Sequence, residues 1–198
     1  HLRNRRQRQM CIRDRSSGNV VYNRYVNTVG ADEWDLIGSP VEGQSISDFV
    51  TANSGVIATS GVYSAVGTYD NSDDSWENYD SGSVWGSGDF APGTGYQMAT
   101  TSGATLAFTG TIATTDQTQS IINNDGNGSG RRWNLVANPY PSYLNLNSAA
   151  DGTNNLISVN TAMGNQIIDG SFAAVYGWNP NKFGGAGYDS YDNNDTAK

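Results

Sequence analysis

Two acidic segments of the sequence contain the residue types that bind calcium. Asp70, Asp73 and Asp74 place three carboxylates within five residues, and residues 189–195 repeat Asp at every third position. Ca²⁺ takes roughly six to eight oxygen ligands, which flexible Asp- and Asn-rich loops supply. Neither segment has the spacing of an EF-hand. We therefore predict a calcium site at Asp70, Asp73 and Asp74; the alternative for both segments is a solvated acidic turn.

Four aromatic residues around the first acidic segment favour a sugar-binding surface. An aromatic ring flanked by Asp, Asn and Ser can stack on the apolar face of a sugar while its neighbours bind the hydroxyls. The alternative is that these rings hold long loops against the core, because Tyr and Trp commonly lie half-buried. The predicted glycan-binding residues are Tyr69, Trp76, Tyr79 and Trp85.

The composition argues against an enzyme. The single His and the single Cys are His1 and Cys11, so residues 16–198 lack the side chains of Ser-His-Asp and Cys-His catalysis. A glycosidase needs two carboxylates at a fixed separation, and no pair is distinguished by its sequence context. The Gly-rich segment 126–130 lacks the Lys-Ser/Thr of a phosphate-binding loop. We expect a non-catalytic protein with no cofactor other than calcium.

The first 15 residues differ from the rest in charge. They hold six of the 11 Lys and Arg but one of the 19 Asp and Glu, which leaves residues 16–198 with a net charge of −13. The segment from Arg5 to Arg15, RRQRQMCIRDR, resembles the translation of an adapter used to prepare sequencing libraries. We therefore expect residues 1–15 to be an artefact that does not pack against the rest; the alternative is a basic arm. Nucleic-acid binding is disfavoured because phosphate contacts need Lys and Arg.

A seven-residue motif occurs twice, 99 residues apart. Residues 34–40 and 133–139 share the pattern W-x-L-(I/V)-x-(S/N)-P. Each copy is followed by a small polar stretch, an aromatic and Gly-rich strand, and an acidic segment containing Tyr. The second copy ends before any counterpart of residues 90–98. We predict two related units, residues 16–125 and 126–198, and expect the second to be truncated.

Short strands joined by turns are expected to position these residues. Predicted strands include residues 20–26, 34–37, 95–99, 105–109, 119–123, 133–136 and 172–178, where β-branched and aromatic residues gather. One short helix is predicted over Ser47–Asn53, capped by Ser45 or Ser47. Trp34 and Trp133 are expected in the core, with sugar stacking as the alternative. The fold class is an all-β antiparallel sandwich built from two related units, with long loops and one or two short helices.

Residues 18–41 and 133–142 resemble the repeat region of large secreted proteins of Bacteroidota, often cargo of the type IX secretion system. The resemblance rests on the paired Trp motifs, above all WNLVANPYPS at 133–142. It implies secretion or surface display, and it carries over no catalytic residues. No apolar run reaches the roughly 18 residues of a membrane span.

These observations predict a structural or adhesive module that contacts glycans. We expect it to belong to a secreted or cell-surface multidomain bacterial protein, and this chain to be a fragment of that protein from metagenomic sequence. Its expected partners are an extracellular polysaccharide or another surface protein; its oligomeric state is left open. The alternative is an accessory carbohydrate-binding domain of a glycan-degrading enzyme whose catalytic domain lies elsewhere.

Overall fold

The computed structural model describes residues 18–30, 33–82, 88–122, 133–161, 168, 174–179 and 187–192. These residues form short antiparallel strands and two short helices, which confirms the all-β prediction. The described part of the chain contains no helix long and apolar enough to cross a bilayer. Residues 1–15, Trp85, the loop 126–130, Asp195 and the predicted unit boundary lie outside the described ranges.

The largest sheet is built around one long central strand. β4 (Tyr63–Asp70) pairs with β5 (Ser75–Asp80), with β6 (Tyr96–Met98) and with β3 (Thr59–Ser60), and β6 pairs in turn with β2 (Asp35–Ile37). β4 and β5 form a hairpin whose loop spans residues 71–74, a four-residue connection of a common type. The sheet therefore joins segments that lie about 60 residues apart in the sequence, as in the pairing of Leu36 with Gln97.

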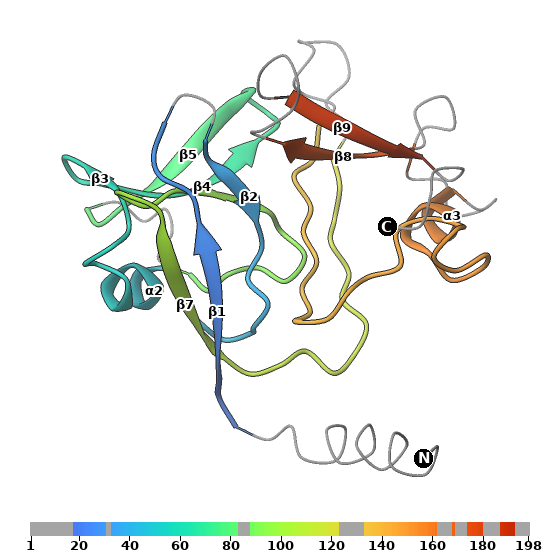
Figure 1. Ribbon diagram of the computed structural model, residues 1–198, viewed down its shortest axis with the longest axis horizontal. Coiled ribbons are helices and arrows are strands. Elements are labelled where there is room, and N and C mark those ends of the chain that lie inside the picture. Colours follow the sequence, from blue (N-terminus) through green and yellow to red (C-terminus); the bar gives the residue numbers. More distant parts are fainter. Residues whose placement is uncertain are drawn as a thin grey trace.

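A second, two-stranded sheet contains β1 (Val20–Val26) and β7 (Ala104–Gly110), which lie side by side in Figure 1. Apolar side chains alternate along β7, where Leu106 and Phe108 are fully buried and Thr105 and Thr109 are exposed. This period of two is that of a strand with one face on a core. The prediction of a strand at Val20–Val26 is confirmed at both ends.

Helix α2 (Ile46–Ala52) begins where the sequence provides a capping residue. The Ser45 hydroxyl accepts a hydrogen bond from the Asp48 N–H at 3.1 Å, which satisfies one of the donors exposed at a helix start. Ile46 and Phe49 share one buried face of this helix. Phe49 packs on Phe108 of β7 with ring centroids 4.6 Å apart.

The main core is formed jointly by the two sheets and α2. Phe90 lies against Phe49, Tyr96 and Phe108 with centroid distances of 5.1, 5.0 and 5.9 Å, and two of these contacts are edge-to-face. Edge-to-face pairs each add about 1 kcal/mol beyond the area they bury. Other buried members of the cluster include Val26, Ile37, Val66, Met98 and Leu106.

The second half of the chain contains one short helix and one pair of antiparallel strands in the described residues. The second Trp motif is followed by helix α3 (Leu156–Thr161) and by an antiparallel hairpin of β8 (Ala174–Asn179) and β9 (Gly187–Asp192). In the first half the Trp motif is followed by α2 and the β4–β5 hairpin. Figure 1 shows α2 and α3 at opposite ends of the molecule.

Three sequence-based expectations are wrong: the strand at 119–123, the strand at 133–136 and the core position of Trp133. Residues 119–122 form no strand, because their polar groups bind side chains instead of a neighbouring strand: Ile122 N–H donates to Asn134 Oδ1 at 2.9 Å. The strand predicted at 133–136 is reduced to one isolated β-bridge, between Val136 and Thr94. Trp34 packs against the core as predicted, whereas Trp133 is half exposed.

Candidate ligand-binding surface

Two of the four predicted glycan-binding rings lie together on the β4–β5 hairpin. Tyr69 and Trp76 face each other across the two strands, with ring centroids 5.4 Å apart and an angle of 59° between the rings. The Trp76 side chain is 41% exposed. Cross-strand aromatic pairs of this kind stabilise a hairpin by a few tenths to about 1 kcal/mol. The pair therefore holds a large aromatic surface at the solvent boundary.

The same face of the sheet carries a row of amide groups beside the two rings. Gly67 pairs with Asn78 on one side and with Gln97 on the other, so all three share a face with Tyr69 and Trp76. The Gln97 Nε2 donates to Asn78 Oδ1 at 2.9 Å across the glycine. A Cβ on Gly67 would collide with both side chains and with the Glu77 carbonyl. Glycine is therefore required for the two amides to meet.

Tyr79 and Trp85 do not join this surface in the described structure. Tyr79 is 9% exposed and belongs to the core cluster, so its ring packs inside the fold. Trp85 lies outside the described residues. The surface thus rests on Tyr69 and Trp76, with the amides of Asn78 and Gln97 beside them.

The predicted calcium ligands occupy the hairpin loop next to the rings. Asp70 Oδ1 accepts hydrogen bonds from the Ser72 hydroxyl at 2.6 Å and from the Ser72 N–H at 2.7 Å. These two hydrogen bonds hold the pKa of Asp70 below its usual value, and the bond from the hydroxyl has the larger effect. The Tyr69 hydroxyl donates to Asp74 Oδ1 at 2.6 Å, and Asp74 has a φ of 55°. Two of the three carboxylates are therefore engaged within the hairpin itself.

Among the described residues, no group of three or more His, Cys, Asp or Glu side chains is placed to hold a metal ion. Calcium binding by Asp70, Asp73 and Asp74 stays a prediction. Binding would raise the melting temperature in millimolar Ca²⁺, and EDTA would reverse the rise.

A second aromatic pair lies nearby and was not predicted as a pair. Trp133 and Tyr176 of β8 meet edge-to-face with centroids 4.9 Å apart. The buried Asn71, next to Asp70 in the hairpin loop, donates to the Ile122 carbonyl at 3.0 Å and to Asn134 Oδ1 at 3.4 Å. Since Asn134 follows Trp133, this contact links the second Trp motif to the hairpin that carries Tyr69 and Trp76.

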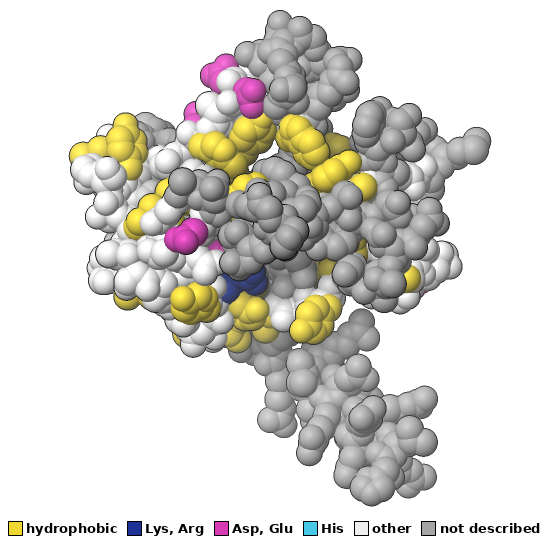
Figure 2. Space-filling view, turned by 45° about the horizontal axis from the view of Figure 1, so that its top comes forward, with side chains coloured by type: hydrophobic (Ala, Val, Ile, Leu, Met, Phe, Trp, Pro, Cys, Tyr) yellow, Lys and Arg dark blue, Asp and Glu magenta, His cyan; other side chains and the backbone are white. Residues whose placement is uncertain are grey.

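The surface combines apolar rings with acidic and amide groups. Figure 2 shows exposed hydrophobic side chains next to acidic ones at the upper end of the molecule. Such a surface can stack on an apolar ring face and hydrogen-bond its substituents. The sequence identified the rings, but it missed the amides, because Asn78 and Gln97 lie 19 positions apart and meet only through Gly67.

Comparison with protein-family models, with curated proteins and with solved structures finds no match to this chain.

Proposed function

We propose that this protein is a non-catalytic structural or adhesive module that contacts glycans through Tyr69 and Trp76. The observation that carries the proposal is the half-exposed Trp76 ring, braced by Tyr69 and flanked by the Asn78–Gln97 amide row. A ring fixed in this way loses little conformational freedom on binding. The amides supply donors and acceptors of the kind that sugar hydroxyls pair with.

The proposed architecture is a β-sandwich made of two related units. It is supported by the shared core between the two sheets and by the repeated order of Trp motif, short helix and antiparallel hairpin. Secretion or surface display in a Bacteroidota-like setting is proposed from the likeness of the Trp motifs alone. On this proposal the partners are extracellular polysaccharides.

The binding proposal is tested on a polysaccharide array followed by affinity electrophoresis. Trp76→Ala removes the stacking ring and is expected to weaken retention by roughly tenfold or more, the equivalent of about 1.4 kcal/mol. Trp76→Tyr keeps a ring and is expected to retain much of the binding. Tyr143→Ala, which removes a fully exposed ring from a loop outside the β4–β5 hairpin, serves as the matched control.

The outcomes separate the alternatives. Absence of wild-type retention on every glycan would refute glycan contact, and equal loss in Tyr143→Ala would show that the effect is not local to Trp76. Release of sugars from a polysaccharide by the purified protein would refute the non-catalytic proposal.

A further inference from the structure

The direction of the backbone groups of β1 follows from the hydrogen bonds of its neighbour β7. The N–H groups of Ala107 and Thr109 donate to Asn53 Oδ1 at 2.9 Å and to Gln44 Oε1 at 3.0 Å, on the side of β7 away from β1. Backbone groups alternate between the two edges of a strand, so Leu106 and Phe108 direct theirs toward β1. Their partners on β1 are the even-numbered residues, Arg24 and Tyr22.

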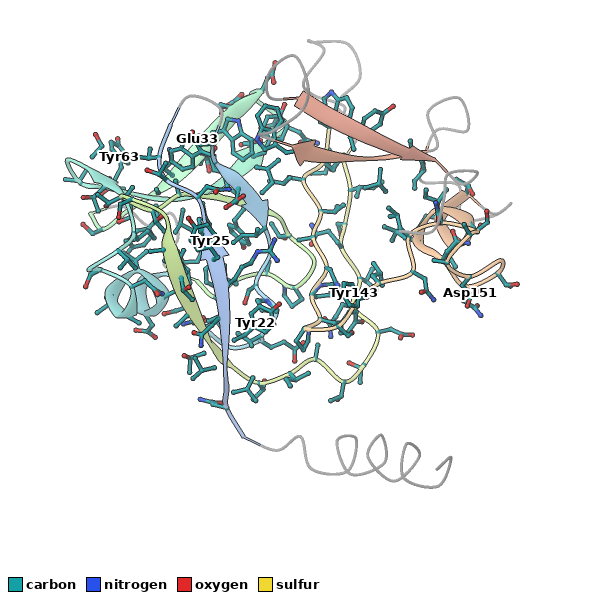
Figure 3. The ribbon with its side chains drawn as sticks, in the orientation of Figure 1. Tyr22, Tyr25, Glu33, Tyr63, Tyr143 and Asp151 are labelled. Atoms are coloured by element: carbon teal, nitrogen blue, oxygen red, sulfur yellow. The ribbon has the colours of Figure 1, made fainter. Side chains whose placement is uncertain are left out.

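The odd-numbered residues of β1 therefore direct their N–H and C=O groups to the opposite edge. Among the described residues, Val21, Asn23 and Tyr25 make no backbone hydrogen bond on that edge. Their side chains are also open to solvent, with Val21 61% and Tyr25 62% exposed. Tyr25 and Tyr22 are both labelled along β1 in Figure 3.

The same edge is closed two residues further along the chain. The Asn27 N–H donates to Asp35 Oδ2 at 2.7 Å, and the Asn27 carbonyl accepts from Thr100 N–H at 2.9 Å. The open stretch is thus confined to residues 21–25. It contains no Pro, no Lys and no bulge, which are features that commonly protect a free strand edge, and its one charged residue is Arg24.

We propose that this edge pairs with β1 of a second copy of the chain, antiparallel and about a two-fold axis at Asn23. Only outward-facing residues can exchange backbone hydrogen bonds, and the register that uses all three of them places Asn23 opposite Asn23 of the second copy and Val21 opposite its Tyr25. Each of these pairs exchanges both N–H···O bonds. The two sheets then join into one continuous antiparallel sheet.

The side chains of β1 fit this register on both faces. On one face Val21 lies beside Tyr25 of the second copy, a β-branched and aromatic pair that stabilises sheets. On the other face Arg24 lies opposite Tyr22 of the second copy, where a guanidinium can lie against an aromatic ring. β1 carries no Asp or Glu, so two copies meet here without opposing acids, although the chain as a whole is acidic, and the two Arg24 residues lie diagonally across the axis, each opposite a Tyr22. The absence of acids and the matching of Val21 with Tyr25 and of Arg24 with Tyr22 are the reasons for assigning the edge to a second copy.

A contact through one strand edge buries less area than a stable dimer does, so the dimer is expected to be weak and dependent on concentration. Sedimentation velocity of the full chain from about 10 µM to about 1 mM measures it directly. Asn23→Pro removes an N–H that β7 does not use and is expected to abolish the dimer with circular dichroism unchanged.

A pair of matched variants tests the surface without touching the backbone. Val21→Lys adds a charge beside Tyr25 of the second copy and is expected to weaken dimerisation by roughly tenfold or more. Val62→Lys makes the same change at an equally exposed Val, 59%, away from β1, and is expected to dimerise like wild type.

A crosslink provides a readout that does not depend on affinity. In a Cys11→Ser background, Asn23→Cys on the two-fold axis places two Cα atoms about 5.5 Å apart, a separation that a disulfide spans. It is expected to form a covalent dimer under mild oxidation, whereas Val62→Cys is not. A monomer at every concentration, equal crosslinking at both positions, or dimerisation unaffected by both Asn23→Pro and Val21→Lys would overturn the proposal. Association that requires an added protein or peptide would overturn it in favour of a different partner.

Discussion

The side chain of Asn53 stands in for a backbone peptide on the edge of β7, and replacing it with Asp tests that role. Its Nδ2 donates to the Phe49 carbonyl at 2.8 Å and to the Ala107 carbonyl at 3.1 Å, and its Oδ1 accepts from the Ala107 N–H at 2.9 Å. The residue is buried. Asn53→Asp keeps the shape and the acceptor but removes both donors and turns a carboxylate toward two carbonyl oxygens.

The expected loss follows from those contacts. The Ala107 carbonyl is left without its donor, which costs about 1–3 kcal/mol, whereas the Phe49 carbonyl keeps the Asn53 N–H at 3.0 Å. With a carboxylate turned toward both oxygens, the variant should lose about 3 kcal/mol of unfolding free energy at neutral pH. Burial and the facing carbonyl oxygens should raise the pKa of the new carboxyl in the folded state above its unfolded value. The variant is then least destabilised at pH below the unfolded pKa, where the carboxyl is protonated and can donate one bond, and the penalty grows as the pH rises through the folded pKa.

Urea denaturation at pH 7 and at pH 4, followed by circular dichroism, measures both effects. Asn19→Asp, the same change at an exposed position before β1, is the control and should shift stability by less than about 0.5 kcal/mol. The reasoning fails if Asn53→Asp is as harmless as Asn19→Asp, or if its penalty increases toward low pH.

Two further predictions test the hairpin surface. Gly67→Ala should destabilise the protein by about 1–3 kcal/mol, because the new Cβ would lie 2.7 Å from the Glu77 carbonyl oxygen, whereas Gly55→Ala has open space and should be neutral in the same thermal melt. Ser72→Ala should raise the pKa of Asp70 toward its usual value in a ¹³C NMR titration, because the Ser72 hydroxyl is the largest cause of the lowering. Since the lowered pKa contributes stability that is lost as the pH falls through it, wild type and Ser72→Ala should differ most above about pH 4 and converge at lower pH. An unchanged Asp70 titration would contradict that assignment.

The elements that the sequence predicts well are those encoded by neighbouring residues. β1 was predicted at Val20–Val26 because β-branched and aromatic residues run through it, and α2 was predicted within one residue because Ser45 precedes an apolar i, i+3, i+4 face. Tyr69 and Trp76 were predicted within one cluster from their shared polar sequence context, and the β4–β5 hairpin brings these two residues, seven apart, into contact. In each case the decisive contact lies within one element or one turn.

The interactions that the sequence does not predict depend on partners far along the chain. The burial of Tyr79 and the exposure of Trp133 depend on which segments cover them, and Tyr176, which contacts Trp133, lies on β8, more than 40 positions away. The strand expected at 119–123 fails for a related reason. Its apolar residues have the right composition, but Asn134 takes the place of a neighbouring strand at Ile122.

The abundance of Asn and Gln, which by composition predicts turns, has a further role in this fold. Asn53 and Gln44 close the far edge of β7. The Asn134 side chain accepts a hydrogen bond from the Ile122 N–H and donates one to the Ile122 carbonyl. A side-chain amide presents the same donor and acceptor as a peptide, so it can end a sheet where no further strand exists. β1 is the contrasting case, since among the described residues no side-chain amide meets the outward N–H groups of Val21, Asn23 and Tyr25. Because β7 is closed on its far edge, the free edge of this two-stranded sheet is that of β1, and this is the edge through which we propose that two copies pair.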